Sequence, residues 1–529
     1  MNQSEQYDVI IIGSGMGALT SASLLAQLEG KRVLMLERHF QAGGYTHAFK
    51  RKRQYEWDVG LHYVGGLGNN GDLRKIFDFI TQDKLKWQQM PSPYDVFHYP
   101  EVKFGMINGA NNVKAALIKK FPDEKSGLDQ YFIDIKRANN WFRQNEMKKN
   151  LPSLLQSLSN FLPNDQEFAL QSLSTYLEKN FKSDQLRAVL TSQWGDYGLP
   201  PTKAPFVIHA LLTSHYFEGA YFPIGGAGRI YELIEPILEK AGGKVLVNHK
   251  VEEILIEGNK AIGVRVVNSR EKDPAIAVKQ YFADTIISGA GAHITYKQLI
   301  PESYPISFRE NLDEFQEKNK TTAHLSLYLG LKESPEKLGF KGENHWIFAD
   351  YDHDAAFDKR NQWVKEKQPV MAYLSFPSLK NPEATGHTAE IITFADYEFF
   401  EKWKEQPWKK RDAEYKTLKS EIAASLLNFV SERFPGFTDL VDYQELSTPL
   451  TTEYMTGHHR GTIYGLSSVA ERFDREKSPW CQARTPIDNL FLTGTEASAW
   501  GIGGALFGGL LSTIHIVKPW NLPRLLKLL

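Results

Sequence analysis

The chain has 529 residues, a net charge of −1 at neutral pH and a pI of about 7.0. This length exceeds what one compact core normally holds, so we expect two or three domains, and the balanced charge argues against nucleic acid as a partner. The single cysteine, Cys481, excludes an internal disulfide and any cysteine-rich zinc or iron–sulfur site, and the scattered histidines form no metal-binding motif.

The two ends of the chain differ in character. The N-terminus has no basic segment followed by an apolar stretch, and no run of about 18 apolar residues occurs, so we expect neither a secretory signal nor a transmembrane helix. We therefore expect a cytoplasmic protein. After Ile516, apolar residues are mixed with Lys518, Trp520, Arg524 and Lys527. This composition fits either peripheral contact with a membrane surface or a tail that packs on its own domain.

The first elements form a strand–turn–helix–strand unit. Residues 7–12 are apolar except for Asp8, which predicts a strand buried on both faces, as in a parallel sheet. A glycine-rich turn over 13–18 follows, then a helix to about Glu29 and a second, mostly apolar strand over 32–36. This succession is typical of a Rossmann-like domain.

The glycine-rich turn carries the pattern Gly13-x-Gly15-x-x-Ala18. In a dinucleotide-binding turn the first glycine allows the tight turn, the second lets the backbone approach a pyrophosphate, and a small third residue allows close helix–strand packing. The helix N-terminus presents free N–H groups to the phosphates. Glu37 stands 19 residues after Ala18 (37 − 18), the spacing expected for an acid that binds ribose hydroxyls. The residues predicted to bind the dinucleotide here are Gly13, Ser14, Gly15, Met16, Gly17, Ala18, Glu37 and Arg38, with Gly43 and Gly44 as further backbone contacts.

The stretch from Glu56 to Gly66 mixes strand-like residues with glycines, a histidine and a tyrosine. Glycine inside a strand often marks close approach of a ligand. The pattern predicts that His62 and Tyr63 lie beside the cofactor. For His62, a histidine satisfied within the core is the structural alternative.

Residues from about 85 to 220 change to helical patterning. Lys, Gln, Leu and Phe recur at helical spacing, as in Ser153–Phe161, which predicts a mostly helical insertion. The pair Pro200-Pro201 interrupts it directly after Trp194–Leu199.

Residues 221–300 return to a sheet-like pattern. Gly225-Gly226-Ala-Gly228 opens a helix that runs to about Ala241, and another helix is expected over Lys416–Phe434. The strands expected in this part of the chain and the next are Lys244–Val247, Val251–Glu257, Ala261–Val267, Ala283–Gly289, Ala323–Leu331, Val370–Phe376 and Glu390–Phe394.

The C-terminal region holds a second glycine-rich turn. A strand over Asn489–Gly494 leads to Glu496, which can accept hydrogen bonds from ribityl hydroxyls. A helix is expected from about Gly504, and its positive end favours the negative charge that a reduced flavin carries. Gly508 and Gly509 cost stability in a free helix, so we expect them to permit close packing against a neighbour. The contacts predicted from this half of the site are Gly289, Gly494, Thr495, Glu496, Gly503, Gly504 and Ala505.

Matched half-sites at both ends of the chain predict an α/β protein with an interleaved organisation. We expect a Rossmann-like FAD/NAD(P)-binding domain of the amine-oxidase and phytoene-desaturase type, interleaved with a mixed α+β substrate domain. The expected segments are 1–84, 221–300 and 476–529 for the FAD-binding domain and tail, 85–220 for the mostly helical substrate or cap insertion, and 301–475 for the mixed-sheet substrate domain.

Several motifs together resemble the phytoene desaturase, carotenoid isomerase and retinol saturase family of flavoproteins, and within it the retinol saturases. The resemblance runs through nearly the whole chain. The motifs that carry it are Asp58–Gly65, Trp194–Pro201, Tyr221–Gly228, Tyr464–Leu466, Arg472-Phe473 and Gly501–Gly509, besides the N-terminal turn.

This resemblance implies a noncovalently bound FAD and a long apolar polyene or isoprenoid lipid in a tunnel above the flavin. It also implies that the backbone of Val251 contacts adenine, and that Gly494 and Glu496 match the family's Gly-x-Asp with the acid lengthened by one methylene. A direct NAD(P)H site has only the fragment Gly289-Ala-Gly291 in its favour, so the electron donor stays open.

The expected chemistry is saturation of one C=C bond by hydride transfer from reduced flavin, with a proton from a nearby acid. The candidates for that acid are His62, Tyr63, Asp196 and Tyr464. Cis–trans isomerisation or desaturation at the same flavin site is the alternative within the family.

Two other kinds of protein share such a fold. A flavin amine oxidase is one, although Cys481, 13 residues before Gly494 (494 − 481), stands too close to that motif to anchor a flavin as in monoamine oxidases. A prenyl-lipid-binding protein without chemistry, like the Rab GDP-dissociation inhibitors, is the other. The complete glycine turn and Glu37 favour the enzyme.

Overall fold

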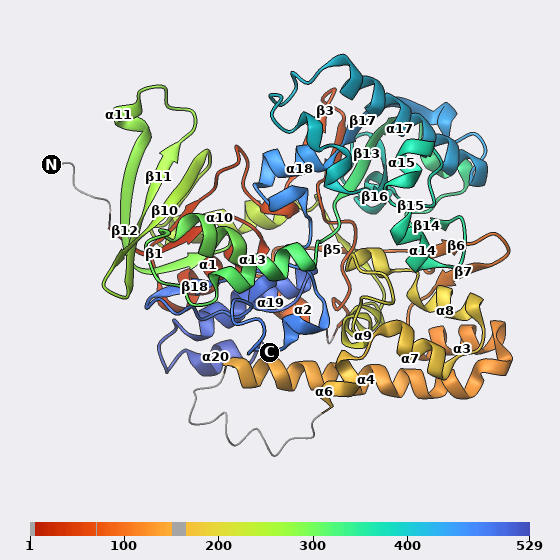
Figure 1. Cartoon of the computed structure of the whole chain (residues 1–529), viewed down its shortest axis with the longest axis horizontal. Coiled ribbons are helices and arrows are strands. Elements are labelled where there is room, and N and C mark those ends of the chain that lie inside the picture. Colours follow the sequence, from red (N-terminus) through yellow and green to blue (C-terminus); the bar gives the residue numbers. More distant parts are fainter. Residues whose placement is uncertain (1–5, 70, 151–164, 529) are drawn as a thin grey trace.

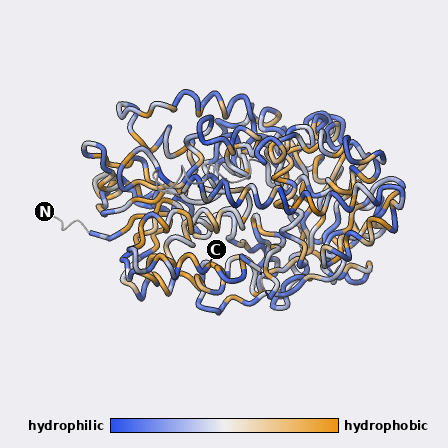
Figure 2. Tube along the Cα trace, turned by 90° about the horizontal axis from the view of Figure 1, so that it is seen from below, coloured by the Kyte–Doolittle hydropathy of each residue, from blue (hydrophilic) through white to orange (hydrophobic). Residues whose placement is uncertain are grey.

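The computed structural model describes residues 6–69, 71–150 and 165–528. Two seven-stranded sheets dominate it and lie toward opposite ends of an elongated molecule (Figure 1). Apolar segments run through the interior of both ends, and many outer loops are hydrophilic (Figure 2). The large cavity that holds the candidate site is lined by residues from both halves.

The first sheet is built from three separate stretches of the chain. Its parallel strands lie in the order β9–β2–β1–β12–β18, which is the strand order of a dinucleotide-binding domain. Its other two strands, β10 and β11, extend the sheet beside the first part of β12. The bounds are β1 (Gln6–Ile12), β2 (Val33–Leu36), β9 (Lys244–Leu246), β10 (His249–Glu257), β11 (Lys260–Asn268), β12 (Val278–Ser288) and β18 (Leu490–Leu492).

One apolar core joins this sheet to a layer of helices. The central strand β1 is buried on both faces, with Val9, Ile10 and Ile11 fully inaccessible to solvent, as its apolar composition predicts. The helices whose residues share this core are α1 (Met16–Glu29), α2 (Asp72–Ile80), α10 (Arg229–Lys240) and α19 (Gly501–Ile514).

Helices α1 and α19 approach each other as closely as backbones can. A Cβ atom added to Gly17 or Gly508 would collide with the backbone of Gly494, and one added to Gly509 would collide with the carbonyl of Gly17. The close packing expected for Gly508 and Gly509 is therefore confirmed. It places the glycine turns from the two ends of the chain side by side.

The second sheet lies between two helical layers. Its strand order is β17–β13–β16–β15–β14–β6–β7, and alternate residues face the two sides. One face packs on α17 (Ala413–Arg433) and α15 (Gln362–Glu366). The strands are β6 (Asp95–His98), β7 (Lys103–Met106), β13 (His324–Leu331), β14 (Asn344–Phe348), β15 (Met371–Ser375), β16 (His387–Phe394) and β17 (Val441–Ser447).

The other face of this sheet meets the helical insertion and the cavity. The helices of the insertion are α3 (Ala110–Lys120), α4 (Lys125–Asn150), α6 (Gln166–Leu170), α7 (Leu173–Asn180), α8 (Asp184–Thr191) and α9 (Phe206–His215). Further elements are β3 (Ala48–Arg51) paired with β4 (Tyr55–Asp58), β5 (Trp87–Gln89) paired with β8 (Tyr221–Pro223), and the helices α11 (Pro274–Ala277), α12 (Ala292–Ile294), α13 (Arg309–Lys318), α14 (His353–Asp358), α16 (Pro377–Lys380), α18 (Pro449–Thr456) and α20 (Leu522–Leu526).

Three local expectations differ from the structure. Residues 87–106 form β5, β6 and β7 rather than helix, because β6 pairs with β14, whose residues lie some 250 positions later in the chain. Strand β14 itself is not among the expected strands, and α19 begins already at Gly501 rather than near Gly504. The expected helical stretch Ser153–Phe161 lies outside the described residues.

The C-terminal tail packs on the first domain. Leu525 and Leu528 are buried in its core, and the Asn521 side chain donates to the Leu28 carbonyl over 2.8 Å. Trp520, by contrast, is 69% exposed. Among the described residues, no helix is both long and apolar enough to span a bilayer.

Replacing Gly508 by alanine tests the contact between α1 and α19. Alanine ordinarily stabilises a helix interior relative to glycine, by about 1 kcal/mol. Here we expect the opposite sign, a loss of about 1–3 kcal/mol, because the new methyl group meets the Gly494 carbonyl. Thermal unfolding of the purified protein measures the change. Gly228→Ala, whose Cβ finds ordinary space, is the control, and equal melting of the two variants would contradict the close contact.

Candidate dinucleotide and substrate site

One large cavity of about 1420 Å³ runs between the glycine turns and the second sheet. Sites for single small molecules usually measure about 300–1,000 Å³, so this cavity has room for a large cofactor and a second ligand. Residues from the first sheet and its turns line one half. Apolar residues of the second sheet and of α9 line the other half.

The N-terminus of α1 forms an open anion cradle at the first half. Its N-cap is Gly15, no side chain caps the free N–H groups, and no acid stands in the first turn. A Cβ atom at Gly15 would meet no atom within 4 Å, so the space beside it belongs to the cavity. This arrangement suits a pyrophosphate, as the sequence pattern predicts.

Glu37 holds the turn in place from the end of β2. Its carboxylate accepts hydrogen bonds from the Ser14 N–H (3.0 Å), the Ser14 hydroxyl (2.6 Å) and the His39 N–H (2.7 Å). The Ser14 hydroxyl oxygen accepts in turn from the Gly43 N–H over 2.9 Å. Gly43 is not among the described residues that line the cavity, so it supports the turn from behind, whereas Gly44 lines it.

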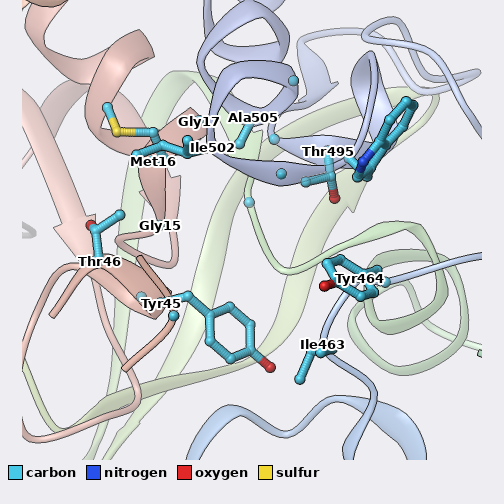
Figure 3. Close-up of a pocket in the computed structure, with 18 of the residues that line it drawn as sticks. Gly15, Met16, Gly17, Tyr45, Thr46, Ile463, Tyr464, Thr495, Ile502 and Ala505 are labelled. Carbon is cyan, nitrogen blue, oxygen red and sulfur yellow. The ribbon is translucent and has the colours of Figure 1, made fainter. Parts of the chain in front are cut away.

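The second glycine turn lies beside the first and lines the same cavity (Figure 3). Gly494 and Gly501 have positive φ angles of 88° and 73°, and a Cβ atom at either would meet nothing within 4 Å. Helix α19 starts at Gly501 with no acid in its first turn and no side-chain cap. A second helix N-terminus therefore opens onto the same space.

Glu496 lines the cavity, but its carboxylate already has backbone partners. One oxygen accepts from the Leu466 N–H at 2.8 Å, and the other accepts from the Ala292 N–H. Glu496 thus holds two distant loops against the turn. The sequence suggests only its role toward a ligand, because nothing local indicates that residues 292 and 466 converge on it.

The remaining predicted contacts also face this cavity. The described residues that line it include the following predicted dinucleotide contacts: Gly13, Ser14, Gly15, Met16, Gly17, Ala18, Glu37, Arg38, Gly44, His62, Val251, Gly289, Gly494, Thr495, Glu496, Gly503, Gly504 and Ala505. Gly289 directly follows β12 and lies beside Gly13, so the fragment Gly289-Ala-Gly291 belongs to this site and does not form a second one.

The four candidates for the acid, His62, Tyr63, Asp196 and Tyr464, line the cavity as well. Burial and the nearby Lys380 lower the pKa of His62 to about 3, so its imidazole is neutral at physiological pH. The Tyr464 hydroxyl donates to the Gly195 carbonyl over 2.7 Å. Its ring lies across the pocket from Met16 and Gly17, as does that of Tyr45 (Figure 3).

Tyr63 and Asp196 form a hydrogen-bonded pair in the cavity wall. The Tyr63 hydroxyl lies 2.7 Å from Asp196 Oδ2 and 3.0 Å from Asp95 Oδ2. Burial and the Asp95 charge raise the pKa of Asp196 to about 8. A carboxyl group with such a pKa is largely protonated at neutral pH.

Gly65, two residues after Tyr63, has a structural reason rather than the expected ligand. A Cβ atom at Gly65 would collide with the backbone of His215, and the Gly65 N–H donates to His215 Nε2 over 2.8 Å. Burial lowers the pKa of His215 to about 4, which keeps this nitrogen free to accept. In the same motif, Gly60 and Gly66 do line the cavity.

Three buried ionisable residues behind the wall are missing from the sequence-based set. Lys380 Nζ donates to the His62 carbonyl (2.9 Å), and burial lowers its pKa to about 7. Glu390 Oε2 lies 3.3 Å from His62 Nδ1, and burial raises the pKa of Glu390 well above its usual value. Because the lowered pKa of His62 leaves its imidazole neutral, its contact with Glu390 is not an ion pair. Asp95, the third, lies on β6, and no local signal marks any of them.

The second half of the cavity is mainly apolar and aromatic. Its walls come from β14, β15 and β16 of the second sheet and from α9, and the residues involved are Leu211, Leu212, Tyr216, Trp346, Met371, Tyr373, Ile392 and Phe394. No group of three or more metal-ligating side chains occurs in the described parts of the chain. The arrangement suits an apolar ligand beside a dinucleotide.

Comparison with known proteins agrees with this geometry. A family model described as an NAD(P)-binding Rossmann-like domain matches residues 11–80. The chain is 34% identical to the all-trans-retinol 13,14-reductase of Danio rerio, over 96% of this chain and 85% of that protein. It is 26% identical to the chloroplastic prolycopene isomerase of Arabidopsis thaliana, over 98% of this chain and 84% of that protein.

A solved structure shows the same fold at low identity. The cyclohexylamine oxidase of Brevibacterium oxydans superposes with a TM-score of 0.61 at 14% identity, over 96% of this chain and 98% of that one. The expected fold class, a Rossmann-like domain interleaved with a mixed α+β domain, is confirmed.

Removing the Glu496 carboxylate tests its bracing role. In Glu496→Ala, the N–H groups of Ala292 and Leu466 lose their acceptor, and we expect a destabilisation of about 1–3 kcal/mol for each one that stays unpaired. Chemical denaturation of protein freed of small molecules measures the effect. Glu314→Ala, at an exposed position of α13, is the control. Equal midpoints for both variants would show that Glu496 does not brace the loops.

Proposed function

Because this chain belongs to the family of the all-trans-retinol 13,14-reductases, we propose that it is an FAD-dependent oxidoreductase that saturates a C=C bond of a long apolar polyene of the retinoid or carotenoid type. The observation that carries the proposal is the single cavity that joins two glycine-lined helix N-termini to an apolar wall. Because both halves line the same cavity, a cofactor and a lipid can bind there next to each other.

The residues present fit FAD as the dinucleotide. The α1 N-terminus would hold the pyrophosphate, Glu37 would meet ribose hydroxyls, and Val251 lies at the cavity wall where adenine is expected. Cys481 is buried and is not among the described residues lining the cavity, which supports noncovalent binding. When bound, FAD supplies hydride chemistry, and the chain supplies orientation and exclusion of water.

The apolar half of the cavity supports a hydrocarbon substrate. Trp346, Met371 and Phe394 offer no charged or strongly polar group to orient a polar ligand such as an amine. A polyene fits this wall because its binding depends on the burial of apolar area. The named relatives act on all-trans-retinol and on prolycopene, which are both polyenes. This supports a polyene as the class of substrate.

Isomerisation is the second candidate reaction. The prolycopene isomerase aligns over nearly the whole of this chain, and a polyene isomerase can use the same cofactor without net redox change. The two reactions differ in whether the product gains hydrogen. The glycine turn that the Rossmann-like family model matches is the turn that we assign to FAD. We therefore propose no separate NAD(P)H site, and the electron donor stays open.

We also propose peripheral contact with a membrane surface through the tail. Trp520 is 69% and Leu526 48% exposed, Lys518 Nζ lies 5.3 Å from the Trp520 ring centre, and Leu526 also lines the cavity. Exposed apolar residues flanked by cations suit the interface of an anionic bilayer. A lipid substrate leaving the bilayer there would meet the cavity directly.

Filling the phosphate cradle tests the cofactor. Gly15→Val adds a side chain whose Cβ atom meets no atom within 4 Å and which projects into cavity space, so we expect normal folding but loss of bound flavin. The wild-type protein should show the visible absorption of oxidised flavin. After anaerobic reduction, it should convert a polyene into a product about two mass units heavier, because a hydride and a proton add across one double bond.

Each departure from these results has a distinct meaning. An unchanged product mass with altered retention would establish the isomerase. A colourless wild-type protein would contradict the flavoenzyme altogether and leave a lipid-binding protein. Gly228→Ala serves as the folding control for the variant and should keep its colour.

Co-sedimentation with vesicles tests the tail. We expect the wild-type protein to bind vesicles that contain anionic lipid, and the double variant Trp520→Ser, Leu526→Ser to bind them far less. Ile276→Ser, which removes an exposed apolar residue on α11, is the matched control (Figure 1). Equal binding by all three proteins would exclude the tail as the contact.

A further inference from the structure

The strongest unassigned feature is a buried hydrogen-bond chain behind the apolar wall. It links Asp196 at the cavity, the Tyr63 hydroxyl and Asp95 on β6, in that order. Asp95 is fully inaccessible to solvent. Two carboxyl groups that share one tyrosine raise the question of which of them carries a proton.

The surroundings of Asp95 are those of an anion. Three N–H groups point at its carboxylate: Gln193 Nε2 at 2.8 Å, Asn344 Nδ2 at 2.8 Å and Trp346 Nε1 at 3.1 Å. None of these groups can accept a proton from Asp95. The Asn344 amide is also fixed in this orientation, because its oxygen accepts from Lys380 Nζ over 2.5 Å. Burial raises the pKa of Asp95, and its hydrogen bonds lower it again, so these donors favour the ionised form.

The surroundings of Asp196 are those of a neutral acid. Its only hydrogen-bond partner among the described residues is the Tyr63 hydroxyl. That hydroxyl has one proton, and Asp95 also lies within 3.0 Å of it. If both carboxyl groups were ionised, two negative charges would face one hydroxyl that has a single proton to donate. We therefore infer that, besides the proton of the Tyr63 hydroxyl, the group carries one more proton and that this proton lies on the Asp196 carboxyl group.

We propose that Asp196 is the proton donor in saturation of the polyene, with Tyr63 and Asp95 as the positioning residues that keep it protonated. This inference rests on the proposed function. A bound, reduced flavin would supply the hydride to one alkene carbon and would itself become oxidised. Asp196 would give the proton of its carboxyl group to the other alkene carbon, so that its O–H bond breaks, and water would later restore that proton.

The Tyr63 hydroxyl can follow the charge through this step. Before transfer it donates to Asp95, and after transfer it can turn its hydrogen bond to the new Asp196 carboxylate. Asp95 keeps its three N–H donors in both states. A donor that moves toward the developing charge stabilises the product state without any rearrangement of the backbone.

Other ionisable groups also face this chain and belong in any account of its pH dependence. Tyr216 stacks on Tyr63 with 4.6 Å between the ring centres. The ring centres of Tyr94 and Tyr373 each lie 6.4 Å from that of Tyr63. Lys380 Nζ lies 6.0 Å from the centre of the Tyr63 ring. The pKa values of the three tyrosines are raised well above their usual range by burial, so they stay neutral. Lys380 interacts with the chain through the charge of Asp95, which raises the pKa of Lys380, and through its hydrogen bond to Asn344.

The test compares Asp196→Asn with wild type in the flavin-loaded protein. Product formation should fall by about 10²–10⁴-fold, the usual contribution of a general acid, while flavin content and thermal stability persist. Asp196→Glu should restore part of the rate. Asp134→Asn is the matched control, because Asp134 is another buried aspartate that accepts from a tyrosine, Tyr176, at 2.8 Å but is not among the described residues lining the cavity.

Two further measurements separate the donor from its supports. The rate of saturation by wild type should fall as pH rises through about 8, where Asp196 loses its proton, and Asp95→Asn should move that fall to lower pH because it removes the neighbouring negative charge. Infrared difference spectra of substrate-free protein at neutral pH should show a protonated carboxyl band that Asp196→Asn loses and Asp134→Asn keeps.

The outcomes distinguish this inference from the proposed function. Wild-type rates in Asp196→Asn, or no carboxyl band lost in that variant, would overturn the assignment of Asp196 while leaving the saturase intact. If wild type saturates no polyene, the donor role falls together with the proposed function, and the infrared spectra still report which carboxyl group is protonated.

Discussion

The contact between α1 and α19 is the constraint on which the rest of the structure depends. These helices come from opposite ends of the chain, and their backbones meet through Gly17, Gly508 and Gly509 around the turn at Gly494. Side chains at these positions would push the helices apart and separate the two glycine turns. Because the turns stay adjacent, two helix N-termini face one cavity, and their partial positive charges act on the same ligand.

The second determining factor is the cost of burying charge in the wall opposite the turns. Asp95, Lys380 and Glu390 lie in a region that excludes water, where an ionised group needs hydrogen-bond partners or gives up its charge. Asp95 has N–H donors and Asp196 lacks them. Two chemically identical side chains therefore acquire different protonation states, which is how one wall can hold both a proton donor and a fixed negative charge.

The cavity connects these two factors. Its dinucleotide half is rich in glycine, where the backbone can approach a cofactor closely, and its other half is rich in large apolar side chains that can take up a hydrocarbon. The same architecture serves an amine oxidase of known structure at 14% identity. The chemistry is therefore decided by the side chains of the wall and not by the fold.

The features that could be predicted from the sequence are the local ones. The turn at Gly13–Ala18, the acid at Glu37 and the glycines of the last helix follow from short-range requirements of backbone geometry, which leave a visible spacing. The strands of residues 87–106, the bracing of two loops by Glu496 and the partners of Asp196 depend on residues far away in the chain. Asp95 lies in a segment for which the sequence pattern predicts helix. Only the pairing of β6 with β14 brings it within hydrogen-bond distance of Tyr63. Tertiary structure alone decided that environment, because desolvation and hydrogen-bond supply depend on what packs around a group and not on its neighbours in sequence.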